Sequence, residues 1–273
     1  MPELPEVETV RRQLKPYILE KEIEKVEVFT QKIINYDKNF AHLLQGLQFI
    51  KIDRVGKLLI FLTSEADTVL LVHLKMTGKL IYFENENVEY KDKHTHVVFH
   101  FSDGSVLTYS DIRKFGYVKR VDPEELKSTK EKYGIEPSTD RFTEDNFAKI
   151  FKKRKTPLKA LLIDQKAIAG LGNIYVDEVC FRAGVRPSRR TNKVTKEERR
   201  KLFKACQEVL DEAIKYGGTT FMNFSDAQNK SGNYSEHLYV FGREGDRCYR
   251  CGSTIKKVRV SGRGTYYCPA CQK

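Results

Sequence analysis

The chain has 273 residues, enough for two or three packed units with a substantial core. Its 49 basic and 37 acidic residues leave a net charge of +12, which favours nucleic acid or an anionic membrane surface as a partner, although a merely basic enzyme has a similar balance. No apolar run reaches the roughly 18 residues of a membrane span, and the acidic N-terminus does not resemble a signal peptide. We therefore expect an intracellular protein.

The chain begins with Met1-Pro2-Glu3-Leu4-Pro5-Glu6. If Met1 is removed, Pro2 carries a free secondary amine, and an α-amino group titrates near pH 8, so that much of it is neutral in the cell. A neutral amine can attack an electrophilic carbon to form a Schiff base, and Glu3 could move protons during that attack. In the alternative, Pro2 only opens a helix. If Met1 is retained, this chemistry is absent.

Residues 1–122 have the patterns of one helix followed by strands. Apolar residues recur at helical spacing over 4–14, and Lys15-Pro16 ends the pattern. Ser102-Asp103-Gly104 is a strong hairpin signal between two strands. The predicted strands are 23–29, 49–62, 68–74, 95–101, 105–109 and 117–121. They predict a β-sandwich or flattened barrel with a leading helix.

Residues 123–140 are polar and predict a linker with one helical turn near 124–132. A helical domain is expected over 141–235: Thr143 caps a first helix, 157–169 form a second, and 173–182 form a third after a glycine turn. Thr195 to Glu198 is a capping box that opens a long helix, which Gly217-Gly218 stops. We expect 219–235 to be a mobile loop and 236–273 to form a separate terminal domain.

The C-terminus contains the strongest local signal. Two Cys-x2-Cys pairs, separated by sixteen residues, suit a closed tetrahedral zinc site with a structural role; the ligands are Cys248, Cys251, Cys268 and Cys271. The segments 255–260 and 265–267 predict a hairpin with Arg263 at its tip, which could enter a DNA groove; a small stabilising ribbon is the alternative. Cys180 and Cys206 lie in apolar helical patterns and are expected to be buried thiols.

Two further features suggest contacts with nucleic acid. Gly170-Leu171-Gly172-Asn173 follows the basic residues 152–155 and Lys159, and the free N–H groups of a helix that starts at such a turn suit a phosphate. His73-Leu74-Lys75-Met76 and Arg113-Lys114-Phe115 place long apolar side chains beside cations, as DNA kinking requires. A plain helical turn and ordinary core packing are the alternatives, and a solvated strand end is the alternative for Lys57.

In order and spacing, the segments 2–10, 73–76, 111–116 and 170–178 and the closing cysteines resemble formamidopyrimidine-DNA glycosylase over nearly the whole chain. The resemblance implies an α+β multidomain protein with an N-terminal β-sandwich, a helix-two-turn-helix domain and a zinc finger. It implies an enzyme of the bacterial cytosol that excises 8-oxoguanine and formamidopyrimidines from duplex DNA. Independently of the resemblance, we expect a monomer, since the sequence shows no exposed heptad or obvious dimer face. The same enzyme would then cleave the abasic strand by β,δ-elimination.

The resemblance also implies roles for individual residues. Pro2 would be the nucleophile on C1′ of the sugar, Glu3 the general acid/base, Glu6 a support for the N-terminal site, and Lys57 a phosphate contact and proton donor. The space left by the flipped base would be filled by Met76 and Arg113, and Phe115 would wedge the opposite strand. The remaining implied DNA contacts are His73, His94, Lys155, Asn173 and Arg263. Main-chain amides of 219–224 would close over the base.

Three residues depart from the family pattern: Lys75 stands where Arg is frequent, Thr77 where Glu or Ser is found, and Met222 where a basic residue is common. The resemblance therefore does not give the lesion preference. Two alternatives stay open. An endonuclease VIII-like glycosylase for oxidised pyrimidines usually has Gly in place of Leu4, and a non-catalytic zinc-finger DNA-binding protein does not explain Pro2, Glu3 and Lys57.

Overall fold

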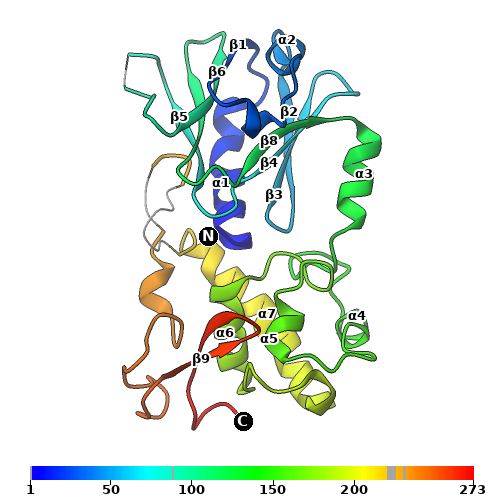
Figure 1. Ribbon diagram of the computed structural model, residues 1–273, viewed down its shortest axis with the longest axis vertical. Helices are drawn as coiled ribbons and strands as arrows, with labels where there is room; N and C mark the ends of the chain where they lie inside the picture. The colour runs from blue at the N-terminus through cyan, green and yellow to red at the C-terminus, as the bar shows by residue number, and fades with distance from the viewer. Residues whose placement is uncertain (1, 88, 220–225, 230–231) are drawn as a thin grey trace. The chain divides into compact units, whose positions relative to one another are not determined.

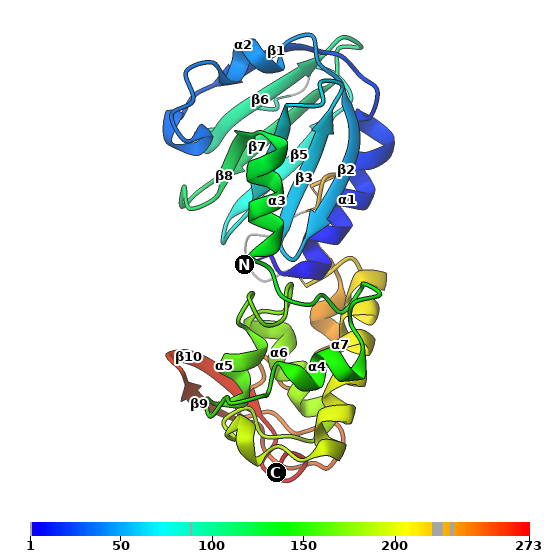
Figure 2. The same ribbon diagram turned by 90° about the vertical axis from the view of Figure 1, so that its right-hand side faces the viewer.

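The computed structural model describes residues 2–87, 89–219, 226–229 and 232–273. The chain forms two compact units (Figures 1 and 2): one is Met1–Glu131 with Tyr216–Asn233, and the other is Lys132–Lys215 with Tyr234–Lys273. The described residues 216–219, 226–229 and 232–233 thus group with the first unit, although 216–235 had been assigned to the helical domain. In the described part of the chain no helix is long and apolar enough to cross a membrane.

The first unit contains two four-stranded antiparallel sheets, with strand orders β1-β6-β7-β5 and β2-β3-β4-β8. The strands are β1 (Ile23–Val28), β2 (Phe49–Val55), β3 (Leu58–Thr63), β4 (Val69–His73), β5 (Gly78–Phe83), β6 (Thr95–Phe101), β7 (Val106–Asp111) and β8 (Tyr117–Val121). β5 was not predicted. The predicted strand 49–62 is two strands, because the chain reverses at Gly56-Lys57, where Gly56 has a positive φ of 55°.

Both sheets contribute to one apolar core. The ring of Phe49 connects them, since its centroid lies 5.2 Å from that of Phe61 in its own sheet and 5.9 Å from that of Phe99 in the other. Aromatic rings at such separations add to the stabilisation that burial provides. This packing confirms the predicted β-sandwich.

Helix α1 (Leu4–Ile18) packs beside β2 and β3 (Figure 2). It runs four residues beyond the predicted end, because Pro16 lies inside the last turn without stopping it. Pro removes one backbone hydrogen bond from a helix, but Ile18, at the helix end, is fully buried in the core. Burial of that side chain offsets part of the cost of the proline. The smaller helices of this unit are η1 (Gln31–Ile34), α2 (Phe40–Leu44) and α3 (Pro123–Glu131).

The second unit is helical, with α4 (Glu144–Lys149), α5 (Leu158–Leu162), α6 (Asn173–Ala183), α7 (Lys196–Lys215), η2 (Thr191–Lys193) and η3 (Tyr234–His237). Both predicted caps are present: the Thr143 hydroxyl accepts from Asn146 N, and Thr195 and Glu198 exchange side-chain bonds with each other's amide. The predicted helix 157–169 was wrong beyond Leu162. Gln165 explains the difference, because its side chain binds Ile163 O, Leu171 O and Gly170 N and so holds a turn.

The C-terminal hairpin pairs β9 (Lys256–Val260) with β10 (Arg263–Tyr267) around Ser261-Gly262. Ser261 and Gly262 both have positive φ, 49° and 79°, as a tight two-residue hairpin turn requires. Arg263 is therefore not at the tip but is the first residue of β10, opposite Val260. Its side chain is exposed.

Candidate active site and DNA-contact residues

The N-terminal catalytic candidates lie at the start of α1. Glu3 is the N-cap residue, and it forms a capping box with Glu6, whose Oε2 accepts from Glu3 N at 2.7 Å. Pro2 is buried, and the exposed fractions of Glu3 and Glu6 are 1% each. A buried carboxylate needs hydrogen bonds to be tolerated, and the unsatisfied N–H groups of a helix start supply them. The fold thus orients two carboxylates next to Pro2.

Glu6 also connects α1 to the segment that follows α7. Its Oε1 accepts from Thr219 N at 2.7 Å. Gly218 lies so close that a Cβ atom there would be 2.7 Å from Glu6 Oε1, and its φ is +80°. Only glycine fits this position without strain. Residues 220–225, which include Met222 and most of the predicted base-covering amides, lie outside the described residues.

A second carboxylate of α1 orders the turn that carries Lys57. Arg54 Nε donates to Glu8 Oε2 at 3.0 Å, and Arg54 Nη1 donates to Gly56 O at 2.7 Å. Although burial alone would raise it, hydrogen bonds from Arg11, Arg12 and Arg54 lower the pKa of Glu8 to about 2. Lys57, the next residue, is 5% exposed. Sequence reasoning missed the pairing of Glu8 with Arg54, because the two residues are 46 positions apart in the chain.

His73 ends β4 and is held as a neutral imidazole. Lys75 N donates to His73 Nδ1 at 3.0 Å, so the proton of the neutral ring is on Nε2. Burial, followed by the nearby cations Lys75 and Lys57, lowers the pKa of His73 to about 3. The ring can therefore donate one hydrogen bond through Nε2 at any physiological pH.

The predicted void-filling residues lie together on the first unit. Arg113 Nη1 is 3.0 Å from Met76 Sδ, and Arg113 Cζ is 4.5 Å from the centroid of the Phe115 ring. Met76 and Phe115 are 41% and 52% exposed, which is unusual for large apolar side chains that have a core available. We call these three residues the wedge. The core-packing alternative is wrong for Met76 and Phe115.

His94 and Lys155 occupy different surroundings. His94 is partly buried, and its carbonyl oxygen accepts a hydrogen bond from Asp111 N at 3.0 Å. Asp111 lies two residues before the wedge residue Arg113 in the chain. Lys155 is exposed in the second unit, where its carbonyl accepts from Arg190 Nη1. Their predicted roles in DNA binding stay predictions.

Asn173 begins α6 in the second unit, directly after the turn Gly170-Leu171-Gly172. Its Oδ1 atom is buried and has no hydrogen-bond partner among the described residues. The helix start also offers backbone N–H groups, which favour an anion. These N–H groups suit the predicted phosphate, but an amide oxygen can only accept a hydrogen bond, so the contact through Asn173 stays a prediction.

Lys159 differs from the exposed lysines near it. We had grouped it with the basic run before the glycine turn, but Lys159 and Asp177 are both fully buried, and Lys159 Nζ lies 2.8 Å from Asp177 Oδ1. Lys159 Nζ also donates to Gly264 O at 3.0 Å, and Tyr266 N donates to Asp177 Oδ2 at 2.9 Å. The pair therefore binds α5 and α6 to the strand that begins with Arg263. Lys159 is not available to a phosphate.

The four C-terminal cysteines form the metal site. One sulfur atom from each lies within 4.8 Å of the others, with 3.9 Å between Cys248 Sγ and Cys271 Sγ and 3.4 Å between Cys251 Sγ and Cys268 Sγ. A zinc–sulfur bond of about 2.3 Å places the sulfurs of a tetrahedral site about 3.8 Å apart. The residues present thus fit one structural zinc ion, which they would hold between the β9–β10 hairpin and the preceding turn.

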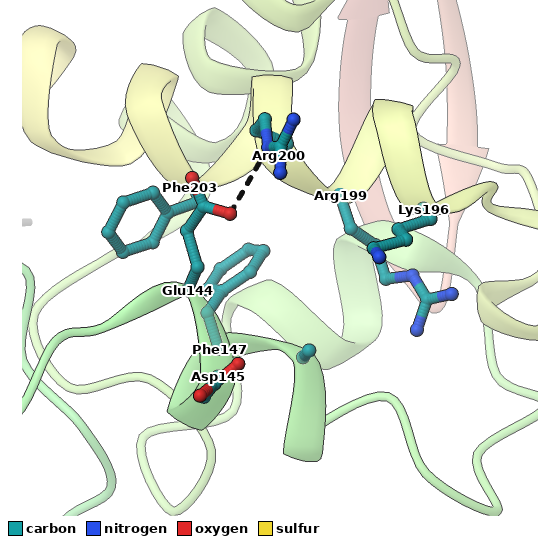
Figure 3. A pocket seen from close by; sticks show the side chains of 8 residues that line it. Glu144, Asp145, Phe147, Lys196, Arg199, Arg200 and Phe203 are labelled. Carbon is teal, nitrogen blue, oxygen red and sulfur yellow. Dashed lines mark hydrogen bonds and ion pairs between the residues drawn. The ribbon is translucent and has the colours of Figure 1, made fainter.

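A concave pocket of about 190 Å³ between α4 and α7 contains none of the predicted site residues (Figure 3). Phe147 and Phe203 line it, and Arg200 Nε donates to Glu144 Oε2 at 3.1 Å across it. The charged side chains of its lining are of both signs: Lys196, Arg199 and Arg200, and Glu144 and Asp145.

Family models match three parts of the chain: the formamidopyrimidine-DNA glycosylase N-terminal domain over residues 1–118, the H2TH domain of the same enzymes over 133–225, and a zinc finger found in FPG and IleRS over 245–273. The match to the zinc-finger family and the geometry of the four cysteines together identify a site for one structural zinc ion with four cysteine ligands.

Similar whole proteins are also known. The formamidopyrimidine-DNA glycosylases of Lactobacillus delbrueckii and Bacillus licheniformis are 43% and 44% identical to this chain, with all of both chains covered. Among solved structures, Lactococcus lactis Fpg with abasic-site DNA has a TM-score of 0.92 at 35% identity, covering 99% of each chain. A mutant of the same Lactococcus lactis protein with Fapy-dG DNA has a TM-score of 0.92 at 36% identity, covering 100% of each. This chain therefore belongs to the formamidopyrimidine-DNA glycosylase family.

Proposed function

We propose that the chain is a bifunctional DNA glycosylase and abasic-site lyase for oxidised purines in duplex DNA, acting as a monomer in the bacterial cytosol. The observation that carries the proposal is the buried Glu3–Glu6 capping box next to Pro2, in a member of this glycosylase family. The Lactococcus lactis structures with abasic-site DNA and Fapy-dG DNA support DNA of these kinds as the substrate.

In the proposed reaction the Pro2 amine, free once Met1 is removed, attacks C1′ of the damaged nucleotide. The N–C1′ bond forms, the glycosidic bond breaks, and the base leaves with the bonding electrons and takes up a proton from water. The Pro2 nitrogen gives its own proton to Glu3, and Glu3 donates a proton to the ring oxygen as the C1′–oxygen bond breaks, so that the sugar opens to a Schiff base between Pro2 and C1′. Loss of a C2′ proton then expels the 3′-phosphate, and a second elimination expels the 5′-phosphate.

The other residues would bind and orient the nucleic acid. Lys57 follows the turn that Arg54 holds, and it would supply a positive charge to the phosphate beside the lesion. His73 donates through Nε2 to a phosphate oxygen, and Asn173 and Arg263 contact the phosphates that flank the everted nucleotide. Phosphate contacts of this kind set position and carry little sequence information.

Borohydride trapping tests the proposal. The substrate is a duplex with one 8-oxoguanine opposite cytosine, and the proteins are wild type, Pro2→Gly and Glu3→Gln, with Glu65→Gln at the exposed β3–β4 turn as the matched control. We expect a covalent adduct on the N-terminal residue in wild type and Glu65→Gln, and much less adduct with Pro2→Gly, whose primary amine can still form an imine but lacks the proline ring. Glu3→Gln should bind the duplex and lose excision. Wild type that binds without trapping or nicking would contradict the proposal.

An oxidised pyrimidine is the second candidate substrate, because one of the similar Lactococcus lactis structures contains oxidised-pyrimidine DNA. A parallel duplex with an oxidised pyrimidine distinguishes the two. Faster single-turnover excision from the purine duplex supports the proposal, and faster excision from the pyrimidine duplex replaces it with an endonuclease VIII-like activity. Mass spectrometry of the purified protein shows whether Met1 has been removed.

A further inference from the structure

The two loops that carry the wedge are joined below the surface by one carboxylate. Asp111 is fully buried at the end of β7. Its Oδ1 accepts from Arg113 N at 3.1 Å and from the Thr77 hydroxyl, and its Oδ2 accepts from Gly116 N at 2.8 Å. Thr77 follows Met76 directly, whereas Arg113 and Gly116 bracket Phe115. One side chain thus holds the backbone around all three wedge residues.

The hydroxyl of Thr77 both donates and accepts a hydrogen bond inside this network. Besides donating to Asp111, it accepts from Arg113 N at 3.0 Å. Thr77 is 8% exposed. A hydroxyl has one proton to donate, and here that proton is committed to the carboxylate. Thr77 therefore differs from a residue that offers its polar group to a bound base, although it stands where the family has Glu or Ser.

Asp111 is itself fixed from its other sides. Its amide donates to His94 O at 3.0 Å, and its carbonyl oxygen lies 2.8 Å from His96 Nε2. Gly116 leaves no room for movement either, since a Cβ atom there would lie 2.5 Å from His73 O. The network thus rests on β4, β6 and β7 rather than on other loops.

Each apolar wedge residue is preceded by a lysine in an unfavourable backbone conformation. Lys75, before Met76, has a φ of 51°, and Lys114, before Phe115, has a φ of 52°. A non-glycine residue in the left-handed region is strained and persists only where surrounding contacts impose it. Lys114 lies between Arg113 and Gly116, whose amides donate to Asp111, and Lys75 lies between the His73 ring, to which its amide donates, and the bonded hydroxyl of Thr77.

We infer that Thr77 and Asp111 are positioning residues that hold Met76, Arg113 and Phe115 as one wedge assembled before DNA binds. The inference rests on the proposed function, in which the wedge occupies the space of the everted nucleotide. Everting a base costs a few kcal/mol. A wedge that is already ordered loses less conformational entropy on insertion and so offsets more of that cost.

Thr77→Val tests the inference, because it keeps the shape of the side chain and removes both hydrogen bonds. Thr77→Ser restores the hydroxyl. Thr63→Val is the matched control: Thr63 is also buried, with its hydroxyl bonded to Glu65 O and Thr68 O at the β3–β4 turn, away from the wedge loops. All three are compared with wild type in single-turnover excision from a lesion duplex, and in cleavage of a single-stranded abasic oligonucleotide, which has no base stack to fill.

We expect Thr77→Val to excise from the duplex about tenfold more slowly, which corresponds to about 1.4 kcal/mol, and to cleave the single strand at the wild-type rate. Thr77→Ser and Thr63→Val should match wild type on both substrates. Thr77→Val at the wild-type rate on the duplex, or an equal loss on both substrates, overturns the inference. If wild type itself excises nothing, the proposed function fails instead.

Amide hydrogen exchange tests the network without catalysis. In DNA-free protein, Thr77→Val should speed exchange at the amides of Arg113 and Gly116 by about tenfold, because their carboxylate acceptor loses its own partner. Asp111→Asn should speed exchange at the same two amides. Unchanged exchange in both variants overturns the inference whatever the enzyme does with DNA.

Discussion

Lys159→Met is the perturbation that most directly tests the packing of the second unit. Methionine keeps the length and apolar volume of the lysine stem and removes its ammonium group. The Asp177 carboxylate then loses the ammonium group that lies 2.8 Å from its Oδ1, although it stays fully buried. It keeps the hydrogen bond from Tyr266 N to its Oδ2. Removing one partner of a buried ion pair typically costs about 3–5 kcal/mol. We expect the free energy of unfolding of the second unit to fall by about that amount near pH 8.

The cost should depend on pH, because the abandoned carboxyl can take up a proton. Burial already raises the pKa of Asp177 to about 7 in wild type, against the lowering effect of Lys159. In the variant the folded pKa is higher still, whereas an unfolded aspartate titrates near 3.9. Between those values the folded state binds more protons than the unfolded state, so stability falls as pH rises, by at most about 1.4 kcal/mol per unit. Lys159→Met should therefore be less destabilised at pH 6 than at pH 8.

Urea unfolding of the zinc-loaded protein, followed by far-UV circular dichroism, measures these effects. Lys159→Met/Asp177→Asn removes both charges and should be more stable than Lys159→Met alone. Lys201→Met is the control, because its ion pair with Glu197 is exposed and exposed pairs contribute about 0–1 kcal/mol. A loss below about 1 kcal/mol in Lys159→Met, or a double variant as unstable as the single one, would refute the argument that this pair is a buried charge couple.

Three further predictions concern the metal, the glycine turn and His73. Zinc removal by a chelator should unfold the β9–β10 hairpin and abolish binding of lesion DNA while the β-sheets of the first unit keep their circular dichroism; normal DNA binding by metal-free protein would contradict the role of the finger. Gly218→Ala should slow excision and reduce stability more than Gly46→Ala. Both glycines have φ near +80°, but an added Cβ atom would contact Glu6 only at position 218. Equal effects of the two substitutions on the melting temperature and the excision rate would contradict the steric argument. His73, with a folded pKa of about 3 against about 6.5 unfolded, should stay neutral at pH 5 in an NMR titration. Because the unfolded ring binds a proton first, the stability difference between wild type and His73→Gln should shrink as pH falls below 6.5, and a wild-type midpoint near 6.5 would show that the ring is not shielded.

Local signals predicted much of this fold. The capping box of Thr195 and Glu198 and the cap at Thr143 each depend on residues three positions apart, and both formed as expected. The spacing of the cysteines likewise predicted the metal site from local sequence, since two short Cys-x2-Cys turns can supply the four ligands of a zinc ion. Alternation of apolar and polar residues indicated β1 and β2, whose burial patterns are mixed, whereas β6 and β7, which are almost wholly buried, were located by the hairpin signal between them.

Interactions between distant residues were beyond the reach of these patterns. Lys159 looks like its exposed neighbours in sequence, and only the folded chain brings it to Asp177 and Gly264. Gln165 ended a predicted helix by binding three backbone groups, which no helix propensity describes. The wedge was predicted by resemblance, but its dependence on Asp111 follows from pairing between β5 and β7, and β5 itself was missed.

Helix α1 shows how one element brings the parts of the candidate site into register. Glu3, at the helix start, caps it beside Pro2, and Glu6 one turn later binds Thr219 N. Glu8 accepts a hydrogen bond from Arg54 in β2, and the same guanidinium group donates to the carbonyl oxygen of Gly56, the residue before Lys57. Three carboxylates within six residues thus connect three separate segments, and a helix fixes the spacing between them. A shift of α1 along its axis would therefore displace Pro2, the proposed nucleophile, and the turn before Lys57 together.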